Sequence, residues 1–97
     1  MRVMARKALR EYAAKEPGAA AELQAWFAEA KHAEWKTPVD VKVKYGNASI
    51  LKNGRVVFNI CGNNYRLVAQ VNYGFGVIYI RFIGTHDEYN NIKAETI

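Results

Sequence analysis

LKNGRVVFNICGNNYRLVAQVNYGFGVIYIRFIGT, residues 51–85, carries the clearest structural pattern in the chain. Runs rich in Val, Ile, Tyr and Phe, which favour strands, alternate there with three turn signals. These signals are Asn53-Gly54, the cluster at residues 61–64 and the Gly-Phe-Gly run at 74–76. Asn-Gly between apolar runs is the strongest short hairpin signal that a sequence offers. The pattern predicts an antiparallel meander of four strands at 48–52, 55–60, 65–73 and 77–84.

The residues before this segment follow a helical period instead. Apolar side chains recur at helical spacing over residues 4–15 and again over 19–34. Pro17-Gly18 separates the two stretches, so they predict an antiparallel helical hairpin. A short helix over residues 37–44 is also expected, because it opens on a Thr-Pro pair.

Length and composition limit the possible architectures. Because a chain of 97 residues has room for one core, residues 1–97 are predicted to form a single domain. Helices followed by a meander predict an α+β fold, with the helical hairpin packed on a four-stranded antiparallel sheet and a short helical turn near the C-terminus. No apolar run approaches the roughly 20 residues that span a bilayer, so no membrane association is expected. The single cysteine, Cys61, agrees with a reducing cytoplasm.

Strand alternation assigns each side chain of the meander to one face of the sheet. Closing the three turns predicts the pairs Ile50–Val57, Arg55–Gln70, Val57–Val68, Asn59–Arg66, Gln70–Tyr79 and Val68–Arg81. One face then collects Lys52, Arg55, Asn59, Arg66, Gln70, Asn72, Tyr79 and Arg81. The other face collects Leu51, Val56, Phe58, Ile60, Tyr65, Leu67, Ala69, Val71, Ile78, Ile80 and Phe82. The second set is apolar and predicts the core that the helices cover.

The polar face predicts a binding site for phosphate. It holds four cationic side chains and no carboxylate, in a chain with 14 basic and 9 acidic residues and a net charge of +5. A solvated sheet face normally mixes both signs, because like charges repel. Clustered cations, and arginine in particular, bind phosphate groups and therefore nucleic acids. A chance distribution of exposed charges and docking to an acidic protein are the alternatives.

His86, which follows the last predicted strand, adds a group that can transfer protons near neutral pH. Tyr89 lies three residues later, on the same side of a helical turn. Together with Arg66 and Arg81, His86 suggests RNA cleavage without a metal or cofactor. In this reaction a base removes the 2′-hydroxyl proton and the alkoxide attacks the adjacent phosphate. Arginines then stabilise the negative charge that develops on the phosphate. Tyr89 could act as acid, base or stacking platform. A capping or surface role for His86 is the alternative reading.

Several motifs appear in order along the whole chain. They are MRVMARKALR at 1–10, WKTP at 35–38, YGNAS at 45–49, RVVFNI at 55–60, GNNYRL at 62–67, IRFIGTHDEY at 80–89 and AETI at 94–97. Together they resemble HigB-type toxins of bacterial toxin–antitoxin pairs. The resemblance implies a RelE/ParE-type fold and an mRNA interferase that acts on the translating ribosome. It also implies a cognate HigA-type antitoxin with a helix-turn-helix domain, and binding of operator DNA only through the toxin–antitoxin complex.

Two rival functions share parts of this pattern. A ParE-type toxin has the same fold but inhibits DNA gyrase without cutting RNA, and a non-enzymatic module would bind RNA through the basic face alone. Under the leading hypothesis, catalytic roles are expected for Arg66, Arg81, His86 and Tyr89, and RNA contacts for Lys52, Arg55, Asn59 and Asn63.

Overall fold

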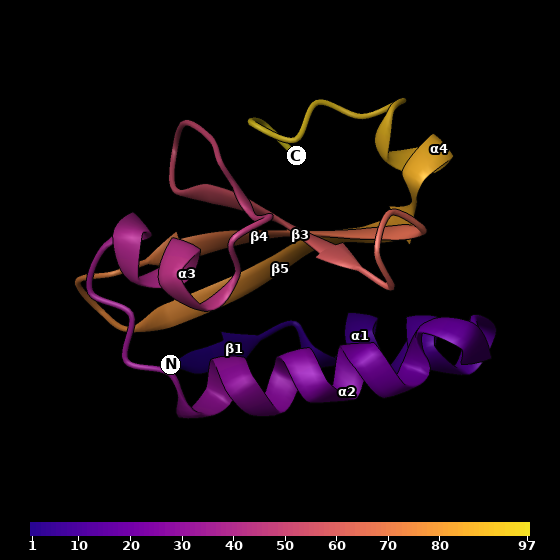
Figure 1. The fold of residues 1–97 in the computed structure, drawn as a ribbon, viewed down its shortest axis with the longest axis horizontal. Helices are drawn as coiled ribbons and strands as arrows, with labels where there is room; N and C mark the ends of the chain where they lie inside the picture. The colour runs from indigo at the N-terminus through magenta and orange to yellow at the C-terminus, as the bar shows by residue number, and fades with distance from the viewer.

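A twisted sheet lies between a helical layer and an irregular C-terminal segment (Figure 1). The computed structural model describes residues 1–97. Its elements are β1 (Arg2–Met4), α1 (Arg6–Lys15), α2 (Pro17–His32), α3 (Pro38–Lys44), β2 (Ser49–Ile50), β3 (Arg55–Ile60), β4 (Tyr65–Asn72), β5 (Val77–Thr85) and α4 (His86–Tyr89). The order across the sheet is β1-β5-β4-β3-β2, with β1 parallel to β5 and the other neighbours antiparallel. The α+β class is confirmed.

The N-terminal residues correct the predicted strand count. Arg2–Met4 pair with Val77–Tyr79 of β5, so the sheet has five strands and is mixed, whereas the sequence predicted four antiparallel strands. A strand of three residues is too short to show alternation, which explains why the pattern missed it. α1 therefore begins two residues later than predicted, after Ala5, whose φ of 65° turns the chain out of the strand. The helical hairpin itself is confirmed, with Glu16 alone joining α1 to α2.

The central registers of the meander match the predictions. Asn59 pairs with Arg66 across β3 and β4, and Gln70 pairs with Tyr79 across β4 and β5. The predicted Asn53-Gly54 turn is present, and both residues have the positive φ (60° and 72°) that this two-residue turn requires. Turn chemistry and hydrophobic alternation were therefore sufficient to align the three longest strands.

The register of β2 was predicted wrongly by one residue. Ile50 pairs with Val56, where the sequence predicted Val57. The Leu51 N–H donates to the Arg55 carbonyl, so one extra residue precedes the turn. A shift of one residue moves a side chain to the opposite face of a sheet. Leu51 accordingly packs away from the helices, although it was predicted in the core beneath them.

A bulge in β5 overturns a second predicted pair. Val68 pairs with Phe82 and Ala69 with Ile80, so Arg81 is the extra residue and does not face Val68. A bulge places two residues opposite one and changes the direction of the side chains beyond it. As a result Phe82 leaves the predicted helix-covered face and joins the apolar side chains on the other side of the sheet.

The main core lies between the sheet and the two long helices. Trp26 of α2 meets Phe58 of β3 edge to face, with 5.3 Å between ring centroids, and Trp35 stacks on the same ring at 6.2 Å. Leu23 and Leu67 are buried on the same side. This packing confirms the predicted position of the helices on one face of the sheet. None of the helices combines the length and apolar character needed to cross a membrane.

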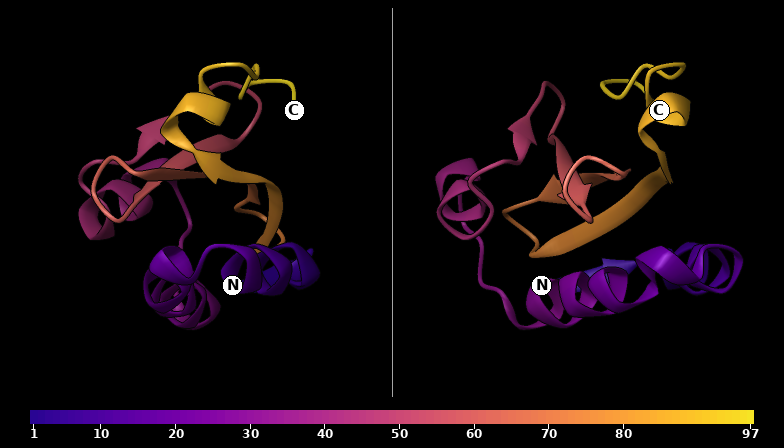
Figure 2. Two further views of the ribbon diagram at one scale, coloured as in Figure 1. Left: turned by 90° about the vertical axis from the view of Figure 1, so that its right-hand side faces the viewer. Right: turned by 45° about the vertical axis from the view of Figure 1, so that its right-hand side comes forward.

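The opposite face of the sheet is covered by residues 90–97, here called the C-terminal segment (yellow in Figure 2). Ala94 is buried there against Val57 and Val68, and side chains at the edge of the cluster complete the packing. These partly buried side chains are Leu51, Phe82, Tyr89, Ile92 and Ile97. The face that was predicted to be open and basic is therefore partly closed by a small apolar cluster.

Candidate nucleic-acid interface

Arg66 is a buried cation at the start of β4, with 8% of its surface exposed. One terminal nitrogen donates to the carbonyls of Asn63 and Tyr65, at 3.1 Å each, and the other donates to the Asn63 side-chain oxygen at 3.3 Å. The guanidinium carbon lies 5.9 Å from the centre of the Tyr89 ring. The turn between β3 and β4 and the helix α4 thus fix the position of this group.

Arg66 has no carboxylate partner. The two ion pairs of the protein, Lys7–Glu11 and Lys44–Glu29, lie elsewhere and are exposed. Removing a charged group from water without a counter-ion is costly, and hydrogen bonds to neutral oxygens offset this cost only in part. A buried guanidinium without a counter-ion is therefore suited to bind an anion.

Arg55 and Arg81 form a cationic pair on the same face. Both donate to the main-chain oxygen of Ile97, from a terminal nitrogen of Arg55 at 2.6 Å and from Nε of Arg81 at 3.1 Å. Arg55 is only 7% exposed, and its Nε is buried without a hydrogen-bond partner. The C-terminal segment thus provides the oxygen acceptor for two guanidinium groups that were predicted to be open to phosphate.

α4 begins with a capping box that holds His86 at the end of β5. The Glu88 N–H donates to Thr85 Oγ1 at 3.1 Å, and the Thr85 N–H donates to Glu88 Oε1 at 2.8 Å. The Thr85 N–H, which donates to the carboxylate, and then the Thr85 hydroxyl lower the pKa of the Glu88 carboxyl below its ordinary value. The His86 N–H donates to the Asn64 carbonyl at 3.0 Å, which ties α4 to the turn beside Arg66.

The imidazole of His86 is exposed to solvent. Its Nδ1 lies 3.2 Å from the side-chain nitrogen of Asn90. Because an amide nitrogen can only donate, Nδ1 accepts in this arrangement and the neutral ring carries its proton on Nε2. The proton-carrying nitrogen is thus the one that Asn90 leaves free.

The predicted site residues fall into two groups. Asn63, Arg66, His86 and Tyr89 come together where the β3–β4 turn meets α4. Arg55 and Arg81 lie further along the sheet. Arg66 pairs with Gly84, three residues from Arg81, which corresponds to about 10 Å along a strand.

The remaining two predicted RNA contacts occupy different surroundings. Asn59 is partly buried beside Arg66, which it faces across β3 and β4. Lys52 is exposed just before the Asn53-Gly54 turn, and no hydrogen bond or ion pair joins it to either group. The structure therefore places Asn59 next to the first group and leaves Lys52 at the rim of the face.

Three features of the site escaped the sequence reasoning. The Thr85…Glu88 capping box has the readable pattern of Thr followed three residues later by Glu. Asn90 lies four residues after His86, the spacing at which helical side chains meet. The contacts of Ile97 had no local signal, because they join residues 42 and 16 positions apart.

Other reactive groups are less suited to chemistry. His, Cys, Asp and Glu side chains nowhere gather in a set of three that could hold a metal ion. Burial, with a smaller effect of Glu22, raises the pKa of the Cys61 thiol, which lowers the fraction of the reactive thiolate. The groups available at the site are therefore guanidinium, imidazole, phenol and amide.

The helical hairpin on one face of a sheet, with arginines and a short terminal helix on the other, is the architecture expected of a RelE-like toxin. A family model described as HigB_toxin, RelE-like toxic component of a toxin-antitoxin system, matches residues 19–92. The chain therefore belongs to the HigB toxin family, whose toxins work with an antitoxin partner.

Named relatives resemble the chain over nearly its full length. It is 33% identical over 96 residues to the mRNA interferase toxin HigB of Escherichia coli, covering 97% of this chain and 92% of that protein. The same values apply to the mRNA interferase HigB of Shigella flexneri. A HigB mRNA interferase from another Escherichia coli strain is 26% identical over 94 residues, covering 95% of this chain and 91% of that protein.

Proposed function

We propose that this HigB-family toxin is an endoribonuclease that cleaves messenger RNA on the translating ribosome and so arrests translation and growth. The observation that carries the proposal is Arg66, a buried guanidinium without a counter-ion that lies beside Tyr89 and the helix bearing His86. Relatives that match over nearly the whole chain are named mRNA interferases, which supports the same activity.

Arg66 and Arg81 bind the scissile phosphate in this proposal. Arg66 is pre-positioned by Asn63, so its guanidinium stabilises the charge that builds up on the phosphate with little reorganisation. Arg81 is exposed and can turn its terminal nitrogens to the phosphate while Nε stays bound to Ile97. Removing one such donor from an anion-stabilising site typically costs about 100- to 1,000-fold in rate.

His86 is the proposed general acid or base. A base takes the proton of the ribose 2′-hydroxyl, the resulting alkoxide bonds to phosphorus, and the bond from phosphorus to the 5′-oxygen breaks. The 5′-oxygen leaves with a proton from the acid, so the products are a 2′,3′-cyclic phosphate and a 5′-hydroxyl. As an imidazolium, His86 can donate the proton on Nε2, the nitrogen opposite the Asn90 contact, in the acid step. Tyr89 is the second candidate for proton transfer and a platform on which a base can stack.

The other polar residues of this face bind the RNA around the cleaved bond. Lys52 is exposed and contacts backbone phosphate, and Asn59 and Asn63 lie beside Arg66. Arg55 binds a phosphate when a phosphate oxygen replaces the Ile97 oxygen as the acceptor.

The proposed partners are a HigA-type antitoxin with a helix-turn-helix domain, messenger RNA and the ribosome, with operator DNA bound only through the toxin–antitoxin complex. Family membership supports an antitoxin of some kind. Because messenger RNA and ribosomes are the targets, the proposed place of action is the cytoplasm.

The test is mapping of 5′ ends on cellular messages minutes after induction of the wild-type chain. New ends in register with the reading frame are expected. They should vanish in Arg66→Ala, Arg81→Ala and His86→Ala, but persist in His32→Ala and Arg10→Ala, which change the same residue types in the helical layer. Thermal unfolding of each purified variant separates loss of chemistry from loss of the fold.

Each contrary result has a definite meaning. Growth arrest with intact messages and induced DNA damage would replace the ribonuclease with a gyrase inhibitor. Toxicity and RNA binding unchanged in His86→Ala, with no cleavage in either protein, would indicate a non-enzymatic RNA-binding module. Cleavage that survives His86→Ala would keep the enzyme and assign the proton transfer to Tyr89.

A further inference from the structure

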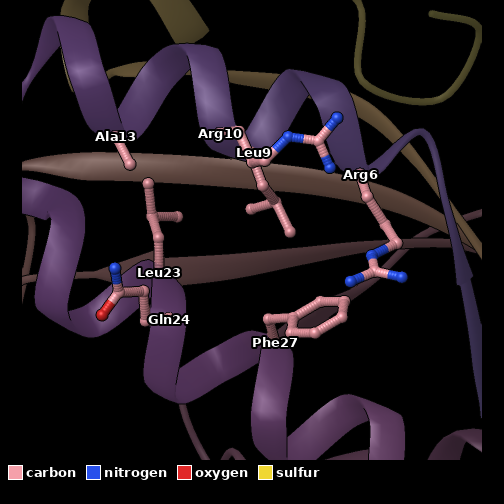
Figure 3. Close-up of a pocket in the computed structure, with 7 residues that line it drawn as sticks. All are labelled: Arg6, Leu9, Arg10, Ala13, Leu23, Gln24 and Phe27. Carbon is pink, nitrogen blue, oxygen red and sulfur yellow. The ribbon is translucent and has the colours of Figure 1, made fainter.

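α1 and α2 leave a pocket between them in the helical layer (Figure 3). Leu9 of α1 and Leu23 of α2 point toward each other at its floor, where both are buried, and the half-buried Ala13 and Phe27 form its apolar sides. Its volume is about 170 Å³, below the roughly 300–1,000 Å³ of typical small-molecule sites. The space therefore suits a single apolar side chain of a protein partner better than a whole small molecule.

The rim of this pocket is positively charged. Arg6 and Arg10 of α1 line it, together with the neutral Gln24, and no carboxylate is among the lining residues. Both arginines are exposed and form no ion pair, and the Arg6 guanidinium lies 4.7 Å from the centre of the Phe27 ring. An apolar depression beside unpaired guanidinium groups is complementary to an acidic segment that carries one apolar anchor.

The pocket is separate from the candidate RNA site. It lies in the helical layer, whereas Arg55, Arg66 and Arg81 lie on the other side of the sheet with the C-terminal segment (Figure 1). RNA bound at those arginines would lie across the sheet from it. Arg6 and Arg10 are therefore available to a second binding partner.

We propose that the α1–α2 pocket docks an acidic segment of the antitoxin, which seats one apolar side chain above Leu9 and Leu23, against Phe27, and sets carboxylates against Arg6 and Arg10. The inference rests on the existence of an antitoxin partner, and it does not depend on which reaction the toxin performs. Aromatic or aliphatic anchors in small pockets commonly contribute most of the binding energy of an interface, and complementary charges set its register.

The test measures the affinity of the purified toxin for its cognate antitoxin by titration calorimetry. Arg6→Glu/Arg10→Glu should weaken binding by roughly 30- to 100-fold, since it sets like charges against the segment. Lys7→Glu/Lys36→Glu makes the same change in net charge at exposed positions outside the pocket and should stay within about threefold of wild type. Ala13→Phe, which fills the pocket without changing its charge, should weaken binding by about tenfold or more.

Growth assays distinguish this inference from the proposed function. The pocket variants should still arrest growth but should no longer be neutralised when the antitoxin is co-expressed. Wild-type affinity in both pocket variants would overturn the inference. Loss of growth arrest with intact antitoxin binding would also overturn it and assign the pocket to the ribosome. Dissociation of a toxin dimer by the variants, again with intact antitoxin binding, would assign it to a second copy of this chain.

Discussion

The two faces of the sheet differ in how much apolar surface they bury and in which charged groups they hold. The helix-covered face contributes to a cluster of 17 buried residues, among them Trp26 and Phe58. The face under the C-terminal segment has a cluster of three, Val57, Val68 and Ala94, and next to it lie the two buried arginines. Because hydrophobic stabilisation grows with the apolar area removed from water, the first face supplies most of the stability. The second can therefore hold buried cations, of which Arg66 has no counter-ion.

Truncating the helix-covered face should have the largest effect on stability. Phe58→Ala removes a ring that contacts Trp26, Trp35 and Tyr45 and is 1% exposed. We expect the free energy of unfolding to fall by about 3–5 kcal/mol, as for other large-to-small changes in cores. Urea unfolding followed by tryptophan fluorescence measures it. A loss below about 1 kcal/mol would show that this face is not the main source of stability.

Changing Arg66 should affect chemistry much more than stability, the reverse of Phe58. Arg66→Lys keeps the charge but loses the forked donors that Asn63 orients. We expect message cleavage to fall by about 100-fold or more. Arg10→Lys, a matched change in the helical layer, should leave it unchanged. Equal effects of the two substitutions would remove the distinction between the faces.

Truncation on the second face should cost less than on the first. Ile92 is half-buried in the C-terminal segment, next to the cluster of Val57 and Val68. We expect Ile92→Ala to lower the free energy of unfolding by about 1–2 kcal/mol, because only part of the side chain is removed from water. The same urea titration checks it. A loss as large as that of Phe58→Ala would mean that the segment is an integral part of the core.

The smallest expected effect is the pH dependence of the α4 capping box. The pKa of Glu88 is lowered on folding, from an ordinary value of 4.5, so its carboxylate stabilises the folded state above that pH. This contribution is lost as the pH falls through the lower, folded-state pKa. The stability difference between wild type and Glu88→Gln should thus shrink between neutral pH and about pH 3. A difference that stays constant in urea titrations at both pH values would contradict the assignment.

Local chemistry was enough to predict the hairpins, the helices and the apolar face. The tight turn at Asn53-Gly54 requires positive φ at both positions, which Asn and Gly readily adopt. An apolar stripe on a helix or on one face of a strand must be buried against a neighbouring element, which limits the possible arrangements. The candidate residues near α4 were also readable, because His86 and Tyr89 follow β5 directly and Arg66 lies opposite Gly84. What these patterns predict depends on neighbours within a few residues or one tight turn.

Tertiary structure alone decided how the second face is covered. The bulge at Arg81 turns Phe82 away from the helices, and β1 joins the sheet through a parallel pairing that spans most of the chain. The Ile97 oxygen reaches Arg55 from 42 residues away. Such contacts depend on the summed packing of distant segments, and no residue pattern near either partner records them. The amino-acid sequence therefore predicted which residues bind phosphate, and the folded chain decided which of these side chains are held in place, covered or left free.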